Sequence, residues 1–137
     1  MKFVLLAILA TTLTAYVSVP AYATTNAVKH IDLPDITSYV EAREVFDQTT
    51  SELRKKNKLD ETELQEVHVI TYSLEKAVAY FSKNMEGDQQ VSAKEIAELV
   101  ELIHLSAENN RASETEVYLQ EYFELANTYR ELSLIHI

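Results

Sequence analysis

Apolar residues recur at alternating intervals of three and four positions from about residue 35 to residue 131. This spacing places them along one face of an α-helix. Interruptions of the pattern predict four helices, over about 35–56, 61–86, 93–109 and 114–131. Because the connections are short, neighbouring helices should be antiparallel. We therefore predict an all-α, up-down-up-down four-helix bundle, with a three-helix core and a loosely attached first helix as the alternative.

Residues that favour helix N-termini support these four starts. Ser, Thr, Asp or Asn at the first position accepts a hydrogen bond from the backbone, and a Glu three residues later can return one. The start signals are Ser38 or Asp35, Asp60 with Glu63, Ser92 with Glu95, and Ser113 with Glu116. The only glycine, Gly87, is expected to end the second helix with a positive φ.

The first 23 residues have the pattern of a secretory signal peptide. Lys2 precedes an apolar, threonine-rich stretch, and Ala21-Tyr22-Ala23 offers small residues at the two positions that signal peptidase recognises. The stretch is shorter and less apolar than a membrane anchor. We expect cleavage after Ala23, export to the periplasm and no stable membrane insertion of the mature chain. Residues 24–34 carry no periodicity and are expected to form a flexible lead.

Composition excludes several classes of function. The 137 residues include 12 Lys plus Arg against 22 Asp plus Glu, and no Cys. The length indicates one domain after the signal peptide. Without Cys, disulfides, thiolate zinc sites and iron–sulfur clusters are excluded. The net charge of -10 argues against a nucleic-acid partner. No nucleophile lies in a recognisable catalytic motif, so we expect no enzyme.

Two histidines within predicted helices, His68 and His104, are the candidate ligands for a transition metal or haem. Glu101-Leu102-Ile103-His104 matches the Glu-x-x-His pattern of di-iron bundles, which makes Glu101 a third candidate ligand. The corresponding position in the second helix is Gln65, so the second motif that those bundles need is missing.

The predicted positions of the two histidines along the bundle axis weaken the hypothesis of one shared ion. With the turn between the second and third helices centred near Gln89, His68 and His104 would be offset by roughly 9 Å along the bundle. A small ion with bonds of about 2 Å would not easily reach both rings. A haem between them stays open. The alternative is two separate, half-buried histidines that bind neighbouring polar groups.

Two segments resemble known sequences. The stretches Glu66–Glu75 and Ile103–Glu108, within a run from Thr62 to Glu131, resemble a family of small, secreted, uncharacterised helical proteins of marine gammaproteobacteria. That resemblance implies a periplasmic bundle and brings no activity. Leu132–Ile137 resembles a translated transposase-end sequence of sequencing adapters. We therefore exclude residues 132–137 from functional reasoning.

The sequence thus favours a secreted, periplasmic, non-catalytic binding or accessory module with no cofactor. Its partner would be an unknown protein or small ligand. The alternative is a bundle that binds haem or a metal ion through His68 and His104. Tyrosines at helical spacing suit an interface as well as a core edge, which leaves a homodimer open.

Overall fold

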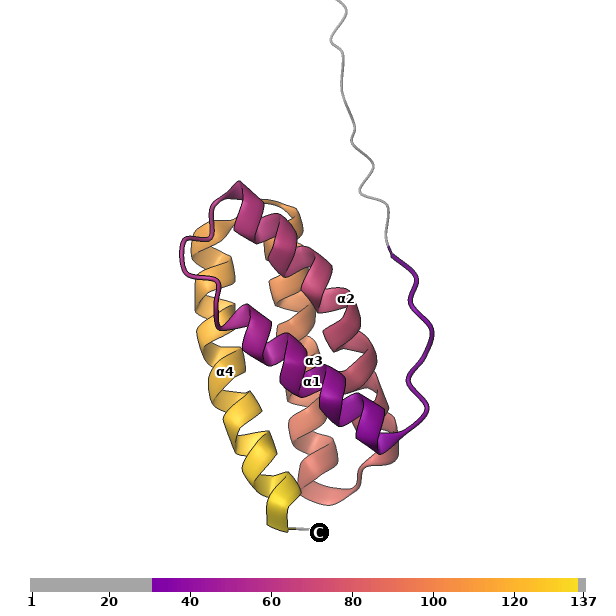
Figure 1. The fold of residues 1–137 in the computed structure, drawn as a ribbon. Coiled ribbons are helices and arrows are strands. Elements are labelled where there is room, and N and C mark those ends of the chain that lie inside the picture. The colour runs from indigo at the N-terminus through magenta and orange to yellow at the C-terminus, as the bar shows by residue number, and fades with distance from the viewer. Residues whose placement is uncertain (1–30, 136–137) are drawn as a thin grey trace, which may run out of the picture.

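The structure, a computed structural model, describes residues 31–135, which form four α-helices and no strand (Figure 1). The helices are α1 (Tyr39–Leu53), α2 (Glu61–Asn84), α3 (Gly87–Glu108) and α4 (Ala112–Ile135). In Figure 1, α2, α3 and α4 run alongside one another and α1 lies obliquely across them. The predicted all-α four-helix fold is confirmed. The proposed signal peptide lies outside the described residues.

The helix α1 belongs to the core of the bundle. Its residues Ala42, Phe46 and Leu53 are fully buried. The Phe46 ring packs against Phe81 of α2 at a centroid distance of 5.8 Å and against Tyr129 of α4 at 5.7 Å. Since one aromatic side chain of α1 contacts both neighbouring helices, the alternative of a loosely attached first helix is not what the structure shows.

The starts of α1 and α2 follow the predicted caps. Ser38 Oγ accepts a hydrogen bond from the Glu41 amide at 3.2 Å, and Asp60 Oδ1 accepts one from the Glu63 amide at 3.0 Å. The Glu63 carboxylate accepts hydrogen bonds from three successive backbone amides of the preceding loop, those of residues 57, 58 and 59. These amides hold the pKa of the Glu63 carboxyl below its usual value. The loop before α2 is thereby tied to the first turn of the helix.

The third helix begins earlier than predicted. Its first residue is Gly87, with φ of 58°, and the predicted cap Ser92 is buried within the helix. Gly87 does have the expected positive φ, but it opens α3 instead of closing α2, which is capped by Met85. A glycine at this position lets the chain reverse direction at once, because positive φ carries no Cβ penalty there. The turn between α2 and α3 is therefore centred on Met85 and Glu86, not near Gln89. Similarly, Ser113 lies inside the first turn of α4.

Two of the three tyrosines of α4 face the interior. Tyr122 and Tyr129 are both fully buried and contact Phe46, at centroid distances of 6.4 and 5.7 Å. Tyr129 also packs against Phe81 at 5.1 Å. These two rings build the core and do not contribute to a surface that could pair two copies. Among the helices of the described region, none is long and apolar enough to cross a membrane.

Candidate metal centre

His68 of α2 and His104 of α3 meet in the interior of the bundle. Their ring centroids lie 4.6 Å apart with an angle of 82° between the ring planes. The residues are 1% and 5% exposed. The predicted axial offset is wrong because the turn is centred on Met85 and Glu86, so His68 precedes the turn by nearly as many residues as His104 follows it. The two histidines are neither separate nor half-buried, but each does bond to a neighbouring polar side chain, as that alternative expected.

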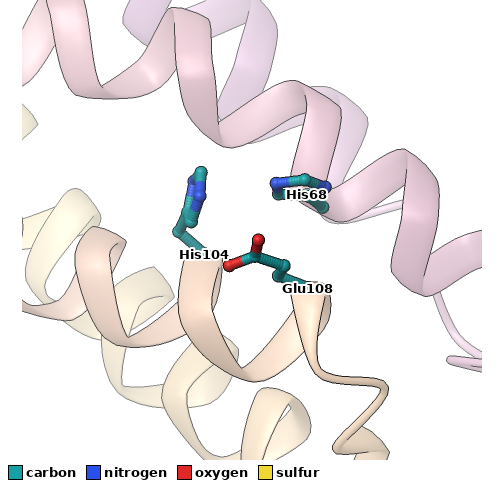
Figure 2. A group of neighbouring side chains, drawn as sticks. All are labelled: His68, His104 and Glu108. Carbon is teal, nitrogen blue, oxygen red and sulfur yellow. The ribbon is translucent and has the colours of Figure 1, made fainter. Parts of the chain in front are cut away.

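A carboxylate completes a group of three possible ligands. One ligand atom from each of His68, His104 and Glu108 lies within 4.8 Å of the other two, and Glu108 is half-buried. Figure 2 shows the Glu108 carboxylate reaching from α3 toward the space between the two imidazole rings. Two helices thus supply two nitrogen ligands and one oxygen ligand.

The structure places the predicted ligand Glu101 outside this group. Glu101 is exposed, whereas Glu108 is in the group. Side chains of a helix tilt toward its N-terminus. Glu108, one turn after His104, therefore leans back toward the imidazole, while Glu101, one turn before it, leans away. The Glu-x-x-His motif therefore contains one residue of the group, His104, and one glutamate that lies outside it.

Two polar side chains of α2 hold the Nδ1 atom of His104. Thr71 Oγ1 lies 2.9 Å from this nitrogen, and Glu75 Oε1 lies 3.0 Å from it. Thr71 also donates its hydroxyl hydrogen to the carbonyl oxygen of His68 at 2.6 Å. The Thr71 side chain is fully buried, and 35% of the Glu75 side chain is exposed. The second histidine is therefore oriented from the helix that carries the first.

Tyr72 packs against both imidazoles. Its ring centroid lies 5.2 Å from that of His68 and 4.9 Å from that of His104, edge-on in the second case. Its hydroxyl forms a hydrogen bond with Nε2 of His68 at 3.2 Å. While this bond holds, Nδ1 is the nitrogen that His68 presents to an ion. Tyr72, which is itself buried, limits the rotation of both rings.

The donor set suits a divalent transition metal. Imidazole nitrogens favour Zn²⁺, Cu²⁺, Ni²⁺ and Co²⁺ over Ca²⁺ and Mg²⁺, which prefer oxygen ligands. Ligand atoms around an ion with bonds of about 2.0–2.1 Å lie roughly 3.4 Å apart, so small side-chain rotations would close the group. Three protein ligands leave at least one position for water or another ligand.

Neither Glu108 nor Glu75 was predicted as part of the site, although both stand at a helical spacing from a polar residue of the site. Glu108 follows His104 by four positions, and Glu75 follows Thr71 by four, which places each pair on one helix face. In a chain with 22 acidic residues, such pairs arise often by chance. Only the packing of α2 on α3 distinguishes these two glutamates from the others.

Comparison with known proteins identifies the family. No curated protein and no solved structure matches the chain. A family of unknown function, DUF6746, matches residues 1–131, which is nearly the whole chain. The match ends directly before Leu132, and the adapter origin of residues 132–137 stays a prediction. The prediction that the chain is a member of an uncharacterised family is confirmed: the chain belongs to the DUF6746 family.

Proposed function

We propose that this protein is an exported, non-catalytic binding protein whose ligand is a divalent transition-metal ion held by His68, His104 and Glu108. The observation that carries the proposal is the convergence of these three side chains, with ligand atoms within 4.8 Å of one another. Two imidazoles placed edge to face in a buried position are oriented by Thr71 and Glu75 on one side and by Tyr72 on the other.

The separation of the rings favours a small ion over haem. Two imidazoles on neighbouring positions of one ion, with bonds of about 2.0–2.1 Å, hold their ring centroids roughly 4.5–5.2 Å apart. Two imidazoles on opposite faces of a haem hold them about 6.4 Å apart, with the porphyrin between. The distance between the centroids of His68 and His104 is 4.6 Å, which agrees with the first arrangement.

The burial of the site supports binding without turnover. Both imidazoles are almost fully removed from solvent, and the carboxylate of Glu108 is only half-buried. Glu108 is the most exposed of the three residues, so we expect an ion to enter from its side. The signal-peptide pattern of residues 1–23 supports the periplasm as the compartment in which this protein would bind its ion.

A zinc titration tests the proposal. The purified protein is titrated with Zn²⁺ in competition with a chromophoric chelator, and Co²⁺ is then added to follow its visible absorption. We expect one tight equivalent of Zn²⁺ per chain and a Co²⁺ spectrum typical of four or five nitrogen and oxygen ligands. Absence of any binding at micromolar Zn²⁺ would contradict the proposal.

A matched pair of glutamates on α3 supplies the control. Glu108→Gln removes the carboxylate ligand at a half-buried position, and Glu101→Gln makes the same change at an exposed one. Loss of an outer-shell partner of a metal ligand weakens affinity roughly 10–100-fold, and loss of a ligand should cost at least as much. We therefore expect Glu108→Gln to weaken zinc affinity by at least this factor, and Glu101→Gln to bind zinc as the parent protein does. Equal effects of the two substitutions would assign the zinc to the acidic surface.

A further inference from the structure

We infer that Thr71 and Glu75 fix His104 as the tautomer with hydrogen on Nδ1, so that Nε2 is the atom that binds the metal. This inference rests on the proposed function for its metal, but the tautomer itself is a property of the protein without an ion. It assigns two positioning residues of α2 to a site whose ligands Glu108 and His104 lie on α3.

The direction of the hydrogen bonds determines the tautomer. The backbone carbonyl of His68 can only accept, so the Thr71 hydroxyl donates its hydrogen to that oxygen at 2.6 Å. The Thr71 oxygen then offers only lone pairs to Nδ1 of His104, 2.9 Å away. An ionised carboxylate also only accepts, and Glu75 Oε1 lies 3.0 Å from the same nitrogen. The hydrogen bond of Nδ1 goes to Thr71 Oγ1, and the negative charge of the nearby Glu75 carboxylate also favours a hydrogen on this nitrogen.

This tautomer prepares His104 for a metal. A neutral imidazole with hydrogen on Nδ1 has its lone pair on Nε2. An acceptor on the other ring nitrogen, here Thr71 Oγ1, fixes the ring plane, and a carboxylate beside that nitrogen raises the basicity of the ligand, which strengthens the metal bond. Because Thr71 and Glu75 follow His68 on α2, the helix that provides one imidazole also orients the other. No movement of α2 relative to α3 is needed to set the tautomer.

The same arrangement separates the roles of the two glutamates. Glu108 is in the group of three ligand atoms, whereas Glu75 contacts the nitrogen that faces away from the ion in this assignment. Loss of Glu108 removes a ligand. Loss of Glu75 leaves all three ligands in place and removes only the orientation and polarisation of His104.

Two measurements test the inference, one without metal and one with it. Long-range ¹H–¹⁵N spectra of the metal-free protein at pH 8 report the tautomer of His104 directly. We expect the Nδ1–H form in the parent protein and in the control Glu98→Ala, whose glutamate is exposed on α3. In Thr71→Val combined with Glu75→Ala we expect a mixture of tautomers. A parent protein with hydrogen on Nε2 would overturn the inference.

The second measurement is zinc affinity. We expect Glu75→Ala to weaken binding roughly 10–100-fold with one ion still bound per chain, and Glu75→Gln, whose amide oxygen keeps a polar atom beside Nδ1 without the charge, to restore part of the loss. Unchanged affinity in Glu75→Ala would refute the positioning role while leaving the metal site intact. If the parent protein binds no zinc, the proposed function fails, and the tautomer in the metal-free spectra still decides whether the hydrogen-bond assignment is right.

Discussion

The two buried tyrosines of α4 differ in one hydrogen bond, which allows its contribution to be measured. Tyr122 and Tyr129 are both fully buried, and both rings contact Phe46. The Tyr122 hydroxyl bonds to Thr50 Oγ1 at 2.6 Å, whereas that of Tyr129 has no hydrogen-bond partner within residues 31–135. Burial keeps both hydroxyls away from water and raises the pKa of both phenols well above its usual value.

Replacement of each tyrosine by Phe should therefore have opposite effects. Tyr122→Phe removes a buried hydrogen bond and should lower the free energy of unfolding by about 1 kcal/mol. The loss should not be larger, because Thr50 Oγ1 also bonds to the Phe46 carbonyl at 2.6 Å and stays paired. Tyr129→Phe removes an unpaired hydroxyl, whose burial costs about 1–3 kcal/mol, and should raise the free energy of unfolding by about 1 kcal/mol.

Urea unfolding followed by circular dichroism measures the difference, which we expect to be about 2 kcal/mol between the two variants at an unchanged m-value. Both substitutions keep the ring and its packing, so each variant is the control for the other. A loss of stability in Tyr129→Phe equal to that in Tyr122→Phe would refute the assignment of hydrogen bonds in this core.

Four further predictions concern the loops and the N-terminus. Asp60→Ala removes the cap of α2 and should cost about 1 kcal/mol of stability in urea unfolding. The pKa of Glu63 is lower in the folded state, so its contribution to stability is present above the ordinary value of 4.5 and is lost as the pH falls through the folded value. Glu63→Gln should reduce this acid-side dependence, and a parent-like pH profile in this variant would argue against it. Gly87→Ala should lower the free energy of unfolding by about 1 kcal/mol through backbone strain at φ of 58°. No steric clash should add to this cost, because an added Cβ meets no atom within 4 Å. Expression in a Gram-negative host should yield a periplasmic chain that begins at Thr24, which mass spectrometry of the fractionated cells would establish.

The fold could be predicted because its signals are local. Helical periodicity and the caps at Ser38 and Asp60 depend only on residues within a few positions of one another, and the structure has them as expected. The start of α3 could not be predicted by the same means. Ser92 with Glu95 has the spacing of a capping box, but Ser92 lies on the buried face of a helix that already began at Gly87. The spacing of a capping box does not reveal whether the helix has already begun further upstream.

The candidate site depends on contacts between helices, where a small error in the turn has a large effect. The residue types identified His68 and His104 as candidates. Because the predicted turn lay a few residues too late, the sequence predicted an axial offset of roughly 9 Å between two rings that are neighbours in the structure. Glu108 and Glu75 became recognisable only once α2 and α3 were packed together. Their chemistry is ordinary in an acidic chain, and their position relative to the two imidazoles is what distinguishes them.

The most direct test of the proposed metal site is an X-ray absorption spectrum at the zinc edge of protein loaded with one equivalent of Zn²⁺. The proposal predicts nitrogen and oxygen ligands at about 2.0–2.1 Å, no sulfur ligand, and the outer-shell scattering of two imidazoles, in line with His68, His104 and Glu108. The scattering of His104 should disappear in His104→Ala. A spectrum with oxygen ligands alone and no imidazole scattering would place the zinc on the acidic surface and contradict the account.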